Sequence, residues 1–163
     1  MEQKKVRTRS EMYEVEIIYK RPALETMPQI SSSKDAYELI TRLLNPNTLD
    51  YREVFLALFL TNSNNVLGYS ELGKGTSTGV AIDAKDIILH AIKTHSKAII
   101  ICHNHPSGSL KPSSADKDMT AQLSIISNMF SINLLDNLII TSESYFSFAD
   151  EGLLLKPNNT LLF

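Results

Sequence analysis

The chain has 163 residues, of which 43% are hydrophobic and 21% are charged, and its formal net charge is −2. This length and composition are typical of one soluble globular domain, and the near-neutral balance excludes a global basic field for nucleic acid. A single cysteine allows no intramolecular disulfide, and no apolar run approaches the roughly 20 residues that span a bilayer. The basic N-terminus is not followed by the apolar segment of a secretory signal. We therefore expect a cytoplasmic protein.

Hydrophobic periodicity predicts a short lead-in strand near residues 14–19, followed by mixed strands and helices. The further expected elements are a helix over 34–44, strands over 53–60 and 66–72, a helix over 84–95, a strand over 97–102, a helix over 114–130, and strands over 133–141 and 145–148. The strand over 97–102 (KAIIIC) is the most apolar and should be central in a sheet. We expect an α/β fold, a mixed sheet flanked by helices, with an extension over 1–30, one domain over 31–153 and a tail over 154–163.

The segment HNHPSGSLKPSSAD, which begins at His103, carries most of the functional signal. Residues two apart on a strand face the same side, so His103 and His105 can converge on one ion if the strand continues that far. The proline and glycine residues of 106–112 can turn the chain back and bring Asp116 to the same place. Two imidazoles and one carboxylate leave a fourth position of zinc open, as a hydrolytic site requires.

Asp116 has a second interpretation, because Ser113 and Asp116 also match the pattern of a capping box at a helix start. The histidine pair favours the metal assignment, since two imidazoles at the end of a buried strand otherwise need hydrogen-bond partners that a core does not readily provide. Cys102 is expected to be an inert buried thiol, because strand alternation turns it away from His103.

A hydrolytic zinc site also needs a general base for the attacking water. Glu53 is the first candidate, because a carboxylate at the start of a buried strand is costly unless it has a partner or a task. The alternative is that Glu53 lies at an exposed strand end beside Arg52, and Glu71 is a second candidate for the base. Ser113 could, besides capping, donate a hydrogen bond to the oxyanion that forms when water attacks a carbonyl.

The pair His103-x-His105, with Ser113, Asp116 and the upstream Glu53, resembles the JAMM (MPN+) metalloprotease signature. Within that superfamily, HNHPSG followed by KPSSAD, with AIIIC before it and NLLDNLII and YFSFADEG after it, resembles the bacterial RadC-like proteins. The resemblance implies an α/β/α sandwich around a mixed, curved sheet, related to cytidine deaminase, with zinc on the two histidines and Asp116. It also implies a peptidase or isopeptidase in which zinc-bound water attacks an amide carbonyl, with Glu53 as the base and Ser113 as the oxyanion partner.

The resemblance covers residues 30–153, and the chain departs from it in two places. RadC-like proteins usually have a histidine where this chain has Asn137, and asparagine cannot carry a proton. Longer members carry a helix-hairpin-helix DNA-binding region ahead of this domain, and residues 1–30 are too few and too polar to form one. A second hypothesis is therefore a catalytically silent or DNA-associated accessory protein, in keeping with the family's historical DNA-repair label. Its weak nucleic-acid contact would use the basic N-terminal residues Lys4, Lys5, Arg7 and Arg9.

Overall fold

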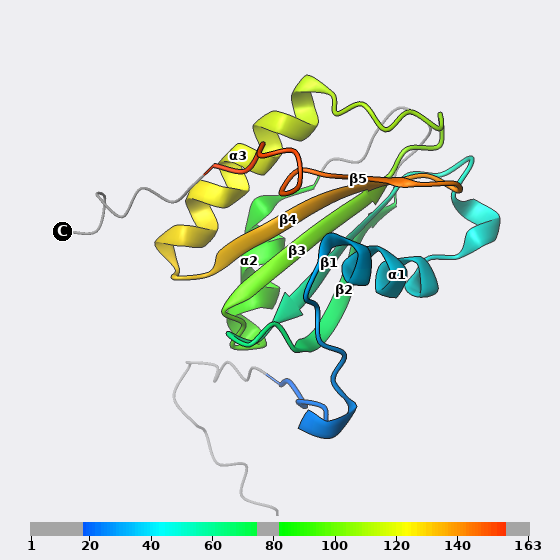
Figure 1. The fold of residues 1–163 in the computed structure, drawn as a ribbon. Helices are drawn as coiled ribbons and strands as arrows, with labels where there is room; N and C mark the ends of the chain where they lie inside the picture. Colours follow the sequence, from blue (N-terminus) through cyan, green and yellow to red (C-terminus); the bar gives the residue numbers. More distant parts are fainter. Residues whose placement is uncertain (1–17, 75–81, 156–163) are drawn as a thin grey trace, which may run out of the picture.

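The computed structural model describes residues 18–74 and 82–155, in which a mixed sheet lies between two helical layers (Figure 1). The helices are η1 (Leu24–Thr26), α1 (Ser33–Leu43), η2 (Pro46–Thr48), α2 (Ala84–Lys93) and α3 (Ser114–Met129). The strands are β1 (Val54–Leu60), β2 (Val66–Lys74), β3 (Ala98–Asn104), β4 (Asn133–Ile140) and β5 (Tyr145–Ser147). The predicted α/β class with a mixed sheet is confirmed. Residues 14–17 of the strand expected near 14–19 and most of the expected tail fall outside the described residues, and residues 18 and 19 are not in a strand.

The five strands form an open sheet in the order β2-β1-β3-β4-β5, so β3 is central, as its apolar sequence predicts. Strand β1 pairs antiparallel with both β2 and β3, and β5 pairs antiparallel with β4. Strands β3 and β4 are parallel, and parallel neighbours need a crossover connection, which α3 provides. This crossover places the start of α3 next to the C-terminal end of β3.

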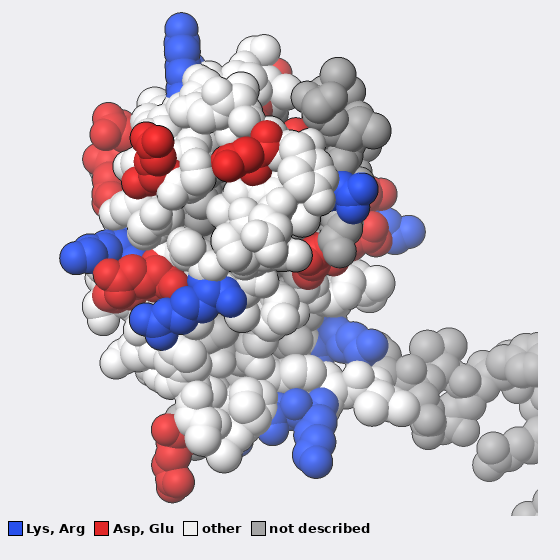
Figure 2. Space-filling view, turned by 90° about the vertical axis from the view of Figure 1, so that its right-hand side faces the viewer, with Lys and Arg blue, Asp and Glu red and all other residues white. Residues whose placement is uncertain are grey.

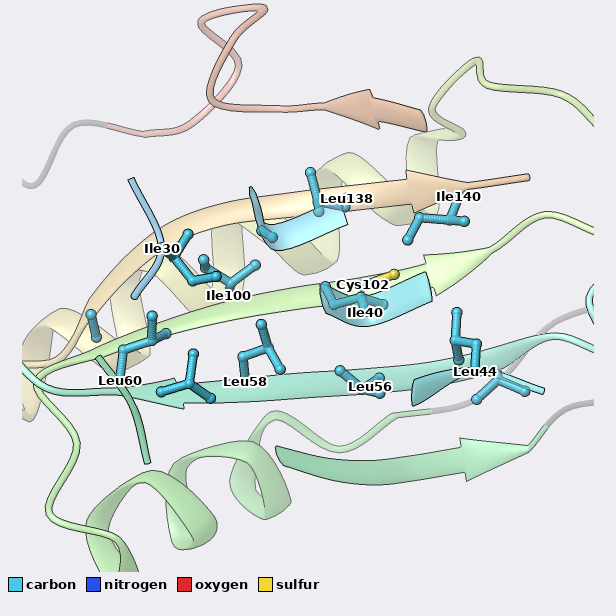
Figure 3. Close-up of a cluster of buried hydrophobic side chains, with 14 of the residues drawn as sticks. Ile30, Ile40, Leu44, Leu56, Leu58, Leu60, Ile100, Cys102, Leu138 and Ile140 are labelled. Atoms are coloured by element: carbon cyan, nitrogen blue, oxygen red, sulfur yellow. The ribbon is translucent and has the colours of Figure 1, made fainter. Parts of the chain in front are cut away.

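Both faces of the sheet are covered, by α1 on one side and by α2 and α3 on the other (Figure 1). All residues of β1 are buried, which explains why its sequence is a continuous apolar run rather than an alternating one. The cluster on the α1 face, which Figure 3 shows, includes Ile40, Leu56, Leu58, Leu60, Ile100 and Cys102. Side chains of the alternate positions, such as Phe55 and Ile101, pack under α2 and α3.

Two predicted boundaries differ from the structure for identifiable reasons. The strand expected to end at Cys102 continues to Asn104, because β1 pairs with it as far as His103 and β4 as far as Asn104. The helix expected to run to residue 95 ends at Lys93, since His95 adopts a left-handed φ of 55° that a right-handed helix cannot accommodate. In the described part of the chain, no helix is long and apolar enough to cross a membrane.

Candidate metal centre

The candidate metal centre forms where β3 ends and α3 begins. His103 is the next-to-last residue of β3 and lies opposite Phe55, on the face covered by α2 and α3. The backbone N–H of His105 donates to the carbonyl of Ile140 at 2.9 Å, which holds the chain against β4 beyond the strand end. Gly108, with a φ of 77°, then turns the chain, and its N–H donates to the His105 carbonyl at 3.0 Å. The turn leads the chain back to the start of α3.

The three predicted ligands meet at this point, and their ligating atoms all lie within 4.8 Å of one another. The two histidine Nε2 atoms are 3.0 Å apart. His103 Nε2 lies 3.1 Å from Asp116 Oδ1, and His105 Nε2 lies 3.6 Å from Asp116 Oδ2. Two nitrogens and one carboxylate could therefore bind a metal, and this set of donors is one that zinc prefers.

The ring of His105 is already oriented for such a role. Its Nδ1 lies 2.7 Å from the carbonyl oxygen of Ser109, which can only accept a hydrogen bond. The proton of the neutral ring is therefore on Nδ1, and the lone pair on Nε2 points toward His103 and Asp116. A hydrogen bond from the second nitrogen to a carbonyl is the usual way in which proteins fix a metal-binding histidine.

Asp116 forms the predicted helix cap, and its position is also compatible with metal binding. The N–H and the hydroxyl of Ser113 each donate to Oδ2 of Asp116 at 2.7 Å, and the Asp116 N–H donates to Ser113 Oγ at 3.1 Å. These bonds are the capping box of α3. The other oxygen, Oδ1, faces His103. Capping and metal binding are compatible because they use different oxygens of one carboxylate, and the cap fixes the direction of the second oxygen.

The electrostatics of the group favour a bound cation. Burial raises the pKa of the Asp116 carboxyl, but hydrogen bonds from His103, His105 and Ser113 outweigh it and hold the pKa well below the usual range. In the imidazolium form of His105, Nε2 also carries hydrogen and can donate to Asp116. This hydrogen bond raises the pKa of His105, which burial opposes and the nearby Glu53 supports. Asp116 is therefore ionised at neutral pH, and negative charge converges on the two imidazole rings.

A cavity of about 440 Å³ opens onto the metal centre, and it contains only one of the two candidate bases. Its lining includes Glu53, His103 and Asp116. Glu71 pairs instead with Leu56, whose side chain lies on the α1 face, so Glu71 is on the opposite side of the sheet from His103. The geometry therefore favours Glu53 over Glu71 as the group that can reach a substrate at this centre.

Comparison with known proteins agrees with this arrangement of residues. Residues 30–153 match the sequence profile of the family described as RadC-like JAB domain. The chain belongs to this family.

Its similar relatives include three UPF0758 proteins. The protein of Flavobacterium johnsoniae is 38% identical over 127 residues, which are 78% of this chain and 54% of that protein. The protein of Photorhabdus laumondii is 37% identical over 123 residues, 76% of this chain and 52% of that protein. The protein of Coxiella burnetii is 35% identical over 136 residues, 83% of this chain and 59% of that protein. The chain thus spans a little over half the length of the curated relatives it matches.

Asn104 is a residue that the sequence analysis did not single out. It lies between the two histidines, and its side chain points to the opposite face of the sheet, where it is fully buried. Its Oδ1 accepts from the N–H of Val54 at 2.7 Å, and its Nδ2 donates to the carbonyls of Leu49 and Arg52 at 2.7 and 2.8 Å. Arg52 and Val54 flank Glu53, so Asn104 ties the backbone on both sides of the candidate base to the strand that carries the ligands.

Asn137, at the family's usual histidine position, is linked to Asp116 through α3. Its Nδ2 donates to Thr120 Oγ1 at 2.7 Å, and that hydroxyl donates to the backbone carbonyl of Asp116 at 2.6 Å. Asn137 pairs with Ile101, so it lies on the same face of the sheet as His103, on the neighbouring strand. Among the described residues, Asn137 Oδ1 and His103 Nδ1 are the buried side-chain polar atoms without a hydrogen-bond partner. Both atoms therefore belong to residues on the face of the sheet that α2 and α3 cover. Asn137 Oδ1 is an acceptor without a donor, and His103 Nδ1 carries hydrogen when Nε2 binds a metal.

Proposed function

We propose that the chain is a zinc-dependent hydrolase that cleaves amide bonds of a peptide or protein, as a peptidase or isopeptidase. The observation that carries this proposal is the convergence of His103, His105 and Asp116 at a cavity that Glu53, His103 and Asp116 line together. Membership of the RadC-like JAB family supports it. The single, buried cysteine is typical of a protein from a reducing compartment, and the cytoplasm is the location we propose.

The role that we propose for each residue follows from the position of its side chain. The two imidazoles and Oδ1 of Asp116 hold the metal, and zinc, when bound, acts as a Lewis acid toward water and a carbonyl. Glu53, half-buried at the start of β1, accepts a proton from the attacking water and returns it to the leaving amine. The Ser113 hydroxyl donates to Asp116 in the present arrangement, so its role as oxyanion donor requires that the hydroxyl rotate toward the substrate.

Metal content and turnover test this proposal separately. We expect about one zinc per chain in the purified protein and loss of zinc in both His103→Ala and Asp116→Ala. Glu53→Gln should retain zinc and lose hydrolysis of a quenched fluorescent peptide library, while Glu71→Gln, the matched control, should retain both. A protein that folds normally but refuses added zinc would contradict the metal assignment. Full turnover by Glu53→Gln would contradict the assignment of the base.

The alternative, a DNA-associated accessory protein, relies on basic N-terminal residues that lie outside the described part of the chain. On the face drawn in Figure 2, acidic and basic side chains are interspersed and neither sign forms a continuous patch. A nucleic-acid surface normally gathers lysine and arginine on one face. DNA binding that weakens with added salt and with removal of residues 1–10 would support this alternative.

A further inference from the structure

The outer surfaces of α2 and α3 carry large hydrophobic side chains that the fold does not bury. Leu89 and Phe130 are each 53% exposed, and Met129 is 70% exposed. The same surface includes Ile92 and Ile125. The opposite sides of both helices already fill the core, so these residues are not needed to hold the helices on the sheet. Apolar side chains gathered on neighbouring helices of a soluble domain are typical of a binding surface.

Between the two helices lies a groove of about 740 Å³, a volume in the range of ligand-binding clefts. Its walls are mainly aliphatic and aromatic side chains: Ile82, Ile88, Leu89, Ile92, Ile126 and Phe130. The charged residues that line it, Asp83 and Lys85, have opposite signs, so the groove presents no excess of positive charge. This chemistry does not fit a phosphate-bearing ligand, which needs basic residues, and it fits apolar side chains.

The groove continues into the candidate metal centre. Ile82 and Gln122 line both the groove and the cavity that contains Glu53, His103 and Asp116. A molecule that extends along the groove past these two residues therefore reaches the cavity of the candidate metal centre. Gln122 lies at the junction with an amide that can both donate and accept a hydrogen bond, as the backbone of a bound polypeptide requires.

We propose that the groove between α2 and α3 binds apolar side chains of a polypeptide substrate, on one side of the bond to be cleaved. This inference rests on the proposed hydrolase function, since it is the continuity with the metal centre that identifies the occupant as substrate. The substrate class is then a peptide or protein segment with large aliphatic or aromatic residues a few positions from the scissile amide. Gln122 is the residue we expect to contact its main chain.

Binding without turnover is the direct test. The probe is a short fluorescein-labelled peptide rich in leucine and phenylalanine, with a second peptide in which serine replaces these residues. We expect zinc-loaded Glu53→Gln protein to bind the first peptide and to bind the second at least about tenfold more weakly. Introducing Ile92→Glu should weaken binding of the first peptide about tenfold, whereas Leu153→Glu should not change it. Ile92 and Leu153 are both 44% exposed, so the two variants are matched in their burial, and Leu153 does not line the groove.

If Ile92→Glu is unstable, Leu89→Glu, at a more exposed position on the same wall, replaces it. Equal binding of both peptides, or unchanged binding by the groove variants, would overturn the inference. So would a sedimentation shift from dimer to monomer in Ile92→Glu, because the occupant would then be a second copy of the chain. Zinc-dependent peptide hydrolysis that ignores Ile92→Glu would overturn the groove and leave the proposed function intact. Peptide binding in the groove without any hydrolysis by the wild type would overturn the proposed function and leave the groove as a peptide-binding site.

Discussion

Replacing Asn104 with alanine should cost the domain a large part of its stability, although Asn104 binds no ligand. The substitution removes the three hydrogen bonds to Val54, Leu49 and Arg52. The hydrogen bonds to Val54 and Leu49 are buried, so these two backbone groups gain no direct access to water, whereas the bond to Arg52 is only partly buried. An unsatisfied buried group costs about 1–3 kcal/mol, and a shift of the 49–54 segment recovers part of this, so we expect a total loss of about 3–5 kcal/mol.

Urea unfolding of the metal-free protein at neutral pH measures this loss, and Asn62→Ala, in the exposed turn between β1 and β2, is the control. The control should change the free energy of unfolding by less than about 0.5 kcal/mol. Asn104→Asp should also be destabilised, since a carboxylate keeps the acceptor for Val54 but cannot donate to two carbonyls. A loss below about 1 kcal/mol in Asn104→Ala would refute the hydrogen-bond accounting on which this prediction rests.

Three further outcomes follow from groups around the centre. Burial raises the pKa of the Cys102 thiol, so Ellman's reagent should label Cys102 only after unfolding, and labelling of native protein would contradict its burial. Burial also raises the pKa of Asp136 against the hydrogen bonds from Ser147, Ala149 and Asn137 that lower it. The fold therefore favours the protonated acid, and this carboxyl contributes more stability as the pH falls through its raised pKa toward the unfolded value of about 3.9. Asp136→Asn should thus match or exceed the wild type in urea unfolding at pH 7, and its advantage should disappear in acid. Asn137→Leu, which removes the acceptor on the same face as His103, should weaken zinc binding about 10–100-fold in chelator competition, whereas Asn137→His, whose ring nitrogen offers an acceptor there, should stay close to the wild type.

The convergence of His103, His105 and Asp116 was predictable because it depends on local rules. The period of two along a strand places His103 and His105 on one side, and the turn residues after them permit the return to Asp116. The sequence favoured metal binding over capping for Asp116, and the structure shows that a single carboxylate serves the cap with one oxygen and faces His103 with the other. Pattern arguments assign one role to one residue, whereas a carboxylate has two oxygens to share.

The choice between Glu53 and Glu71 was beyond the sequence for a different reason. Glu71 lies on β2 and Glu53 directly precedes β1, which pairs with β2, and a slip of one residue in that pairing moves a side chain to the opposite face. The pairing of β1 with β2 is irregular between Phe55 and Leu56, so that Phe55 lies opposite Gly73 while Leu56 lies opposite Glu71. This irregularity puts Glu71 on the α1 face. The local amino-acid composition does not predict the irregularity.

The short distance in sequence between His103, Asn104 and His105 explains how one strand end organises the whole centre. The alternation of side chains places the two histidines at the candidate metal centre and Asn104 on the other face, where it holds the backbone on both sides of Glu53. The candidate ligands and the candidate base come from segments about 50 residues apart. Because the buried Asn104 amide bonds to the backbone next to Glu53, β3 fixes the position of Glu53 relative to the histidines. Loss of Asn104 should therefore impair hydrolysis more than zinc binding, because the histidines keep the strand pairing of β3 while Glu53 loses its anchor.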